Sequence, residues 1–499
     1  MSKRVEIVVF IVFCIAVAVL SIFTGLKLHN SSKAGADILT ALFVLLSIGI
    51  SAGAGYIFFS YEKLKIEKIF LMFFIVFGAL YLIILPMFGS NDEPNHWKRI
   101  LQISRGGIIA QSTSQGVGGL LPSNTIVRVK GVKDLFSKFD ENNIEFLEFG
   151  NTAAYSPISY LLHLPGVIAA NLLGDYVFAS AYAGRLSCFL LSLVLLYFII
   201  KKLPFKKKTF FVLTTAPLFL QEASSLNADI FIYISSYIAV AFALIYSYGN
   251  HLDDKMKIRR LIFIFFLSIA ISLMKTVYLP IILIFLMIPA SMFKSRKQAL
   301  FLFSALFIIS FAADLIWTIK SSVAYDTGFN NMAFVFAHPI SFIILLTRNA
   351  AANFLYAIYG SFGGNLGFGV TGESPISLWL IIFYVLSILF VILSEKYQDF
   401  KFLHRFLFFI ISGSVIVLSI ASMIYISINF WQSPNAIIYF TAARYFIPAW
   451  FFIALFISSF KIIHIQIDED KVFKCMLLII PFIHLSAYST LITFFTKYL

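Results

Sequence analysis

Residues 69–99 read IFLMFFIVFGALYLIILPMFGSNDEPNHWKR, and this stretch decides the class of fold. It begins with an unbroken apolar run of about 20 residues, the length that a helix needs to cross a bilayer. In lipid, only helices and closed barrels satisfy every backbone polar group, and a run without alternation favours a helix. The run passes directly into a group of titratable residues at 92–99. The stretch therefore predicts a membrane-spanning helix with chemistry at the membrane surface.

The composition of the whole chain supports the same class of protein. The 499 residues are 60% hydrophobic and only 12% charged, whereas an ordinary soluble domain is roughly 25% charged. This composition excludes a soluble cytosolic enzyme, a disordered protein and a secreted disulfide scaffold. The three cysteines, Cys14, Cys188 and Cys475, lie inside apolar runs, where they predict neither a disulfide nor a metal site.

The distribution of charge predicts the topology of an all-α polytopic membrane protein. The 38 Lys+Arg and 24 Asp+Glu leave a net charge of +14. Most cations fall in short clusters between apolar runs, which the positive-inside rule explains better than a nucleic-acid partner does. We expect about 13 spans, within a range of about 11 to 15, with the N-terminus inside and the C-terminus outside. The expected spans are 5–26, 38–59, 69–88, 177–200, 209–220, 230–248, 261–273, 277–293, 301–319, 378–393, 406–428, 445–463 and 472–495.

Two long regions, 89–177 and 320–375, are expected outside the membrane, and each contains an apolar stretch that we do not expect to span. Residues 155–173 carry Pro157, His163 and Pro165, and are typical of an interfacial or re-entrant helix. Residues 339–359 are interrupted by Arg348 and two asparagines, and are expected to lie on the surface.

The group after the third span is the strongest candidate for a functional site. Asp92 and Glu93 supply adjacent carboxylates, and His96, Lys98 and Arg99 supply an imidazole and two cations. Such groups can serve as a general base, a metal ligand and a phosphate clamp. The alternative is a helix N-terminus, with Asp92 as the N-cap and Pro94 at an early helical position.

Three further charged sites are expected at the same outer surface. Asp229 follows Asn227 in an external turn, where either residue could instead cap the next helix. Lys275 lies where two half-length helices meet, and the alternative is a lysine that snorkels to the surface. Arg444, followed by Tyr445, could hold a phosphate bidentately or simply anchor a span. Arg185 and Asp314 fall inside apolar runs, where a structural pair is favoured over a ligand groove.

Several short motifs resemble those of bacterial membrane proteins grouped as domain of unknown function 2142. They are NDEPNHW at 91–97, GGLLP at 118–122, YSPISYL at 155–161, GRL at 184–186, LNAD at 226–229 and ARYFIP at 443–448. An acidic pair at the start of the first long external loop is also similar to the glycosyltransferase C superfamily. Enzymes of that superfamily take sugars from polyprenyl-phosphate or polyprenyl-diphosphate carriers on the extracytoplasmic face.

The resemblance implies a domain organisation and a set of site residues. Residues 69–465 would form the glycosyltransferase-C-like membrane domain, preceded by two N-terminal helices in 1–68 and followed by a C-terminal helix in 466–499. The acidic motif falls on Asp92 and Glu93, as candidates for the catalytic base. The substrate-binding candidates are His96, Lys98, Arg99, Asp229, Lys275, Arg348, Arg444 and Tyr445. Neither a metal nor another cofactor is expected, because the loop opens with a single acidic pair.

The function implied is a membrane glycosyltransferase of the bacterial plasma membrane. Its partners would be a polyprenyl-phosphate-linked sugar, an envelope glycan or lipid-linked acceptor, and membrane lipid, with no nucleic acid. A transporter or flippase of isoprenoid-linked sugars is the principal alternative, and it would place ionisable residues near the bilayer midplane. The third possibility is a non-catalytic scaffold in an envelope-assembly complex.

Overall fold

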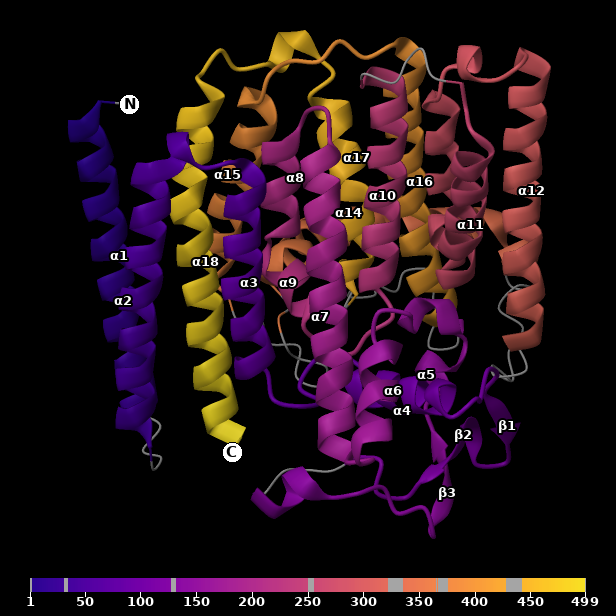
Figure 1. The fold of residues 1–499 in the computed structure, drawn as a ribbon, viewed down its shortest axis with the longest axis horizontal. Coiled ribbons are helices and arrows are strands. Elements are labelled where there is room, and N and C mark those ends of the chain that lie inside the picture. The colour runs from indigo at the N-terminus through magenta and orange to yellow at the C-terminus, as the bar shows by residue number, and fades with distance from the viewer. Residues whose placement is uncertain are drawn as a thin grey trace.

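The fold is a bundle of long, upright helices with a small sheet at one end (Figure 1). The computed structural model describes residues 2–30, 35–126, 132–249, 255–321, 335–364, 366, 376–427 and 442–498. Within these ranges, nine helices are long and apolar enough to cross a membrane. They are α1 (Lys3–His29), α2 (Ala36–Ser60), α3 (Ile66–Ile84), α7 (Val177–Lys202), α10 (Ile230–Tyr248), α12 (Arg296–Ser321), α14 (Pro339–Tyr359), α16 (Phe402–Ser427) and α18 (Glu469–Tyr498). The expected class, a polytopic membrane protein built from helices, is confirmed.

The expected number of 13 spans is not matched by 13 long helices in these ranges. Eight expected spans coincide with long helices, and the other five coincide with shorter elements. Those elements are α8 (Lys207–Thr214) with α9 (Pro217–Ala223), α11 (Ile258–Met274), the 3₁₀ segment η4 (Thr276–Met287), α15 (Leu378–Ser394) and α17 (Ile447–Ile457). Proline explains part of the interruption, because Pro217 begins α9 and Pro280 lies inside η4.

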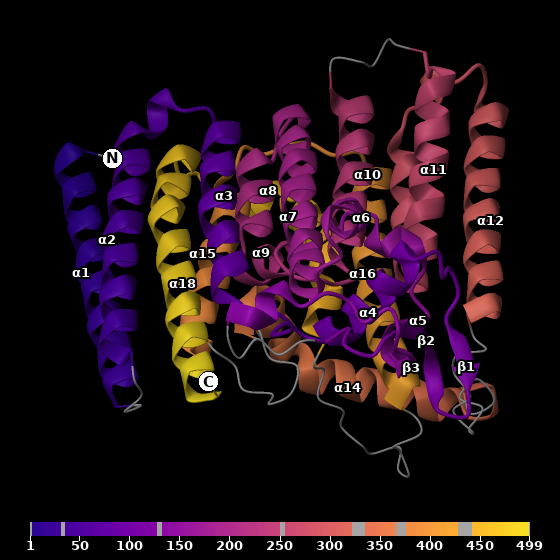
Figure 2. The same cartoon turned by 60° about the horizontal axis from the view of Figure 1, so that its bottom comes forward.

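The ninth long helix, α14, is the stretch that we expected on the surface. Its length and apolar composition satisfy the requirements of a span. Figure 2 shows, however, that α14 runs across the direction of the neighbouring helices rather than along it. It buries Leu345, Asn349 and Asn353 on one face, while Arg348 is exposed. Within the second expected external region, residues 322–334, 365 and 367–375 lie outside the described residues.

Residues 89–177 fold into a compact cap, in which a helix within 155–173 was predicted but the sheet was not. It contains α4 (Glu93–Ser104), α5 (Gly150–Ala153), α6 (Leu164–Leu173) and an antiparallel sheet of β1 (Gln111–Thr113), β2 (Gly116–Pro122) and β3 (Ile144–Glu148). In the register, Gly119 pairs with Leu147. Helix α6 packs along α7 so closely that a Cβ on Gly166 would lie 2.0 Å from the carbonyl oxygen of Ala183. Glycine is therefore needed at this contact.

The two ends of the bundle differ in charge. The N-terminus and the α7–α8 turn lie at one end, and the sheet and the C-terminus lie at the other (Figure 1). We call these the basic end and the sheet end. The basic end carries the clusters at 63–68, 201–208, 255–260 and 294–297. Some of these cations are paired, for example Lys208, whose Nζ lies 2.9 Å from Glu469 and 2.7 Å from Asp470.

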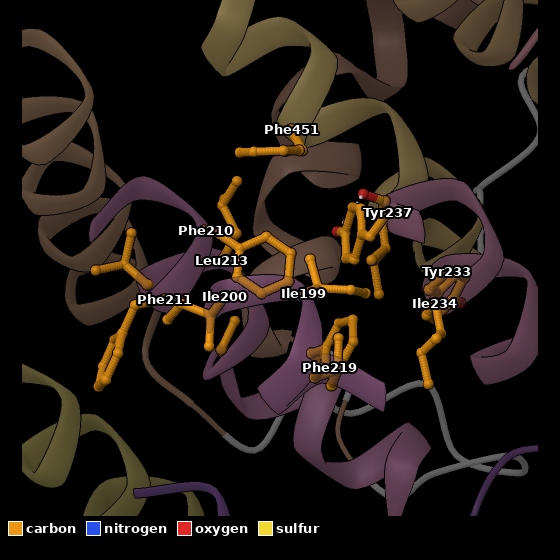
Figure 3. Packing of buried hydrophobic residues seen from close by; sticks show 14 of the residues in the cluster. Ile199, Ile200, Phe210, Phe211, Leu213, Phe219, Tyr233, Ile234, Tyr237 and Phe451 are labelled. Atoms are coloured by element: carbon orange, nitrogen blue, oxygen red, sulfur yellow. Dashed lines mark hydrogen bonds between the residues drawn. The ribbon is translucent and has the colours of Figure 1, made fainter. Parts of the chain in front are cut away.

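An aromatic core joins α8, α9, α10 and α17 (Figure 3). Phe210 of α8 packs against Tyr237 of α10 and Phe451 of α17, with ring centroids 5.5 and 5.6 Å apart. Phe219 of α9 stacks on Tyr237 at 6.1 Å. These rings are buried and hold the four elements together. The aromatic core thereby fixes the positions from which α9, α10 and α17 present polar residues at the sheet end.

Candidate active site

Four charged residues from distant parts of the chain meet at the sheet end of the bundle. Arg444, in the 3₁₀ turn η9 (Ala443–Phe446), donates from Nη2 to Asp92 Oδ2 at 3.1 Å and from Nε to Asp229 Oδ2 at 2.9 Å. Lys275 donates from Nζ to Asp229 Oδ1. The sequence analysis placed all four residues on one face, and the structure joins them into a single ion-pair network. We call Asp92, Asp229, Lys275 and Arg444 the charged cluster.

Asp229 is oriented into the cluster because its neighbour caps the helix. Asn227 Oδ1 accepts hydrogen bonds from the backbone N–H groups of Asp229 and Ile230, both at 2.9 Å. Asn227 therefore satisfies the first turn of α10, and the Asp229 carboxylate makes no capping bond. With a side-chain exposure of 1%, Asp229 is the buried counter-ion of two cations.

Lys275 occupies the break between α11 and η4, in extended backbone. Its ammonium lies 3.6 Å from the centroid of the Tyr445 ring and 5.0 Å from that of Tyr155. Cation–π contact and the bond to Asp229 together stabilise the buried charge. The side chain is 10% exposed and faces the cluster, so the snorkelling alternative does not describe it.

Three side-chain hydroxyls fix the backbone around Arg444. Tyr233 donates to the carbonyl of Arg444 at 2.9 Å, and Tyr278 donates to that of Tyr445 at 3.1 Å. Ser361 donates to the carbonyl of Ala443 at 2.9 Å. The guanidinium is 8% exposed. A buried, hydrogen-bonded Arg444 differs from an interfacial anchor, whose charge would face water.

Asp92 differs from Asp229 because its side chain is 46% exposed. Its backbone is left-handed, with φ 57°, and its side chain does not cap α4. Instead, Oδ2 accepts from Arg444 and Oδ1 accepts from Asn151 Nδ2 at 3.0 Å. Residue 92 therefore occupies the N-cap position of the predicted helix, with Pro94 in its first turn, but its carboxylate binds the charged cluster and makes no capping hydrogen bond. Asp92 links the buried charges to the outer surface, where a second molecule can reach it.

Glu93 lies next to Asp92 in the chain but faces the protein interior. Its carboxylate accepts from Arg185 Nε at 2.7 Å and from Arg185 Nη2 at 2.6 Å, and both side chains are 0% exposed. Glu93 also accepts from the backbone N–H of Leu226 at 2.9 Å and that of Ser90 at 3.2 Å. The structure thus places Glu93 in a buried ion pair, which does not suit the expected role as a base toward an incoming molecule. Arg185 forms the structural pair that we favoured.

The remaining predicted site residues lie in different surroundings. His96 is buried, shares a hydrogen bond of 2.9 Å between Nδ1 and the Tyr160 hydroxyl, and stacks on Tyr155. Burial, followed by the charge of Arg444, lowers the pKa of His96 to about 3, so the imidazole is neutral. Arg99 is buried and donates to the carbonyls of Ile108 and Tyr155. Among the described contacts, none joins Arg348 to the charged cluster.

The sequence analysis missed three neighbours of the charged cluster. Tyr155 flanks Lys275, and its hydroxyl lies 3.4 Å from that of Tyr445. Asn151 binds Asp92. Glu222 of α9 is 2% exposed, and its Oε2 has no hydrogen-bond partner among the described residues. A carboxylate inside an apolar run is itself a signal of function, which could have identified Glu222. Tyr155 begins the YSPISYL motif but was not chosen as a site residue, and Asn151 gave no signal, because both are close to the cluster only in the folded chain.

No group of three or more His, Cys, Asp or Glu side chains suited to a metal ion occurs in the described part of the chain. The charged cluster contains two carboxylates, each bound to a cation. Carboxylates of this kind can accept a proton, and the two cations beside them can bind an anion.

Comparison with known proteins gives one result. A family described as predicted membrane protein (DUF2142) matches residues 74–453. The chain belongs to this family. The DUF2142 match includes all four residues of the charged cluster, as well as Glu93 and Arg185. No curated protein and no solved structure matches the chain. Helices α1, α2 and α18, which pack side by side at one edge in Figure 1, lie outside the matched range.

The buried pair leads to a prediction about stability. Glu93→Ala and Arg185→Ala should each reduce the free energy of unfolding by about 3–5 kcal/mol, because each leaves an uncompensated buried charge. The double variant should lose less than the sum of the two. Thermal unfolding of the purified protein in detergent measures both effects, with Glu145→Ala on exposed β3 as the control. Single variants that unfold at the wild-type temperature would contradict this assignment.

Proposed function

We propose that this DUF2142 protein is an integral-membrane glycosyltransferase. It transfers a sugar from a polyprenyl-phosphate carrier to a hydroxyl group of an envelope glycan or lipid-linked acceptor, with inversion at the anomeric carbon. The observation that supports the proposal best is the charged cluster, in which a half-exposed carboxylate shares Arg444 with a buried one. A base and an anion-binding pair side by side are what such a transfer requires.

In the proposed reaction, the oxygen of the acceptor hydroxyl attacks the anomeric carbon of the sugar. The bond from that carbon to the phosphate oxygen breaks, and its electron pair stays on the departing polyprenyl phosphate. The acceptor proton passes to Asp92. Negative charge therefore grows on the phosphate, where the fixed guanidinium of Arg444 and the ammonium of Lys275 stabilise it.

The resting contacts suggest how the donor prepares the base. Arg444 donates one hydrogen bond from Nε to buried Asp229 and another from Nη2 to Asp92. A phosphate competes with Asp92 for Nη2, because it can bind Nη1 and Nη2 together as a bidentate pair while Nε stays on Asp229. When the donor binds, Asp92 Oδ2 loses this partner and is available to the hydroxyl of the acceptor. Asp229 keeps Lys275 and Arg444 in place throughout.

The site is proposed to face outside the bacterial plasma membrane, with the N-terminus inside and the C-terminus outside. The basic end would then be cytoplasmic, as the positive-inside rule requires. Residues 69–465, with the loops 89–177 and 320–375, would form the catalytic unit, and 1–68 and 466–499 would flank it. The location of the cluster at one end of the bundle favours an enzyme over a transporter, whose ionisable residues should lie near the midplane.

Labelling of cysteine variants in intact cells tests the orientation. An impermeant thiol reagent should label Gln115→Cys, at the exposed tip of the β1–β2 hairpin. It should not label Lys202→Cys, at the exposed end of α7. The unsubstituted chain gives the background from its own three cysteines. The reverse pattern would place the charged cluster on the cytoplasmic side, and equal labelling of both variants would contradict the proposed orientation.

Asp92→Asn tests the base. We expect glycan transfer to fall by about two to four orders of magnitude, because the amide cannot accept the proton. The variant should still accumulate in the membrane and unfold near the wild-type temperature, since the Asp92 side chain makes no capping hydrogen bond to α4. Transfer from a polyprenyl-phosphate-linked sugar by purified protein is the measurement. Normal transfer by Asp92→Asn would exclude this carboxylate.

Variants of Arg444 test the phosphate site. Arg444→Lys should weaken binding of a polyprenyl-phosphate-linked sugar, since lysine supplies charge without the planar fork, and Arg444→Ala should weaken it further. Arg405→Ala, at the basic end, serves as the control because Arg405 also pairs with an aspartate, Asp399. Wild-type affinity in Arg444→Ala would refute the assignment of the donor phosphate to this residue.

A further inference from the structure

The two carboxylate oxygens of Asp92 bind different partners. Its Oδ2 faces Arg444, which belongs to the buried charged cluster. Its Oδ1 faces Asn151, which is exposed and belongs to the external cap. A base must lie within hydrogen-bond reach of the hydroxyl that it deprotonates. If the donor phosphate takes the Arg444 side, the acceptor hydroxyl must approach Asp92 from the side of Asn151.

A row of polar side chains continues from Asp92 across the outer surface of α4 and α5. Asn151 donates to Asp92, and Asn95 Nδ2 donates to Asn151 Oδ1 at 2.8 Å. Lys98 Nζ donates to Asn95 Oδ1 at 3.3 Å and to the carbonyl of Glu148 at 2.8 Å. Asn95 and Lys98 are each partly exposed. We call Asn95, Lys98 and Asn151 the amide row.

We infer that the amide row is the acceptor subsite, and that it binds a carbohydrate through the acceptor's hydroxyl groups. This inference rests on the proposed function, since it takes Asp92 as the base. The geometry points to it because the amide row begins at the exposed oxygen of Asp92 and lies opposite the cations assigned to the donor phosphate.

The chemistry of the amide row suits sugar hydroxyls. An asparagine amide both donates and accepts hydrogen bonds, as a hydroxyl does, and an ammonium carries three donors, of which Lys98 uses two here. The positive charge of Lys98 is offset by the nearby Glu148 carboxylate. The surface therefore carries little net charge, which favours a neutral, hydroxyl-rich ligand over a phosphate.

The row is also held rigidly by the external cap. The buried Thr152 hydroxyl donates to the carbonyl of Asn95 at 3.0 Å, which fixes α4 against α5. The contact of Lys98 with Glu148 attaches the row to the end of β3. Polar groups that are positioned before the ligand arrives lose less entropy on binding. The short helices and the sheet of the cap therefore hold the amide row in place.

The test uses the full-length protein in detergent and methyl glycosides of glucose, galactose, mannose and N-acetylglucosamine as probes. Saturation-transfer NMR reports which of these sugars contacts the protein. At least one probe should give a signal with wild type, and Asn95→Ala and Asn151→Ala should each reduce that signal at least about threefold, equivalent to about 0.6 kcal/mol. Lys98→Met should reduce it as well.

Asn143→Ala is the matched control. Asn143 is exposed on the same cap and makes a single side-chain hydrogen bond, to Ser123 at 3.0 Å, so it undergoes the same change away from the row. The acceptor subsite would be overturned if wild type gave no saturation-transfer signal with any probe. It would also be overturned if the signal were the same in Asn151→Ala, Asn95→Ala and Asn143→Ala. Unchanged thermal unfolding verifies that each variant is folded.

A second probe separates this inference from the proposed function. Farnesyl phosphate, a short polyprenyl phosphate, should bind to Asn95→Ala and Asn151→Ala as it binds to wild type, because the amide row does not contact the donor. Loss of farnesyl phosphate binding in these variants would overturn the acceptor assignment. If wild type and Arg444→Ala bind farnesyl phosphate equally, the donor site of the proposed function fails, whereas the glycoside signals still decide whether the amide row binds sugars.

Discussion

The buried ion pair of Glu93 and Arg185 is the contact on which the geometry of the candidate site depends. Burying two charges is costly, and the pair is tolerated because additional hydrogen bonds surround it. Arg185 also donates to the carbonyls of Leu85 and Pro86, at the end of α3. Glu93 binds Leu226 N–H, three residues before Asp229, and it follows Asp92 directly. One pair therefore connects the two loops that carry the cluster's carboxylates.

In this arrangement, the charged side chains that support the fold are distinct from the carboxylate that is accessible for a reaction. Glu93 and Asp229 are buried and fully engaged with cations, whereas Asp92 reaches the surface. Arg444 is the residue common to both carboxylates of the cluster, so any anion that binds it changes the surroundings of Asp92. The cap formed by residues 89–177 then provides the opposite wall of the site through Asn151. Rigid buried supports beneath an accessible base are the arrangement that a preorganised site requires.

Sequence reasoning succeeded where the signal was local. Unbroken apolar runs predicted the long helices, and Lys275 correctly marked a break between α11 and η4. The sheet was missed because GVGGLLP in β2 shows no clear alternation of polar and apolar residues. Adjacency in sequence suggested a common role for Asp92 and Glu93, but the left-handed residue at 92 turns the two side chains apart. Contacts across 352 positions, as between Asp92 and Arg444, require the fold.

A structure of the protein in lipid nanodiscs with polyprenyl phosphate bound would test the role of Arg444 most directly. We expect the phosphate to lie within hydrogen-bond distance of Arg444 and Lys275, with its chain in the lipid. We also expect Arg444 to have left Asp92, whose carboxylate then faces the amide row alone. A phosphate bound elsewhere, with the Arg444–Asp92 pair intact, would show that Arg444 does not hold the donor.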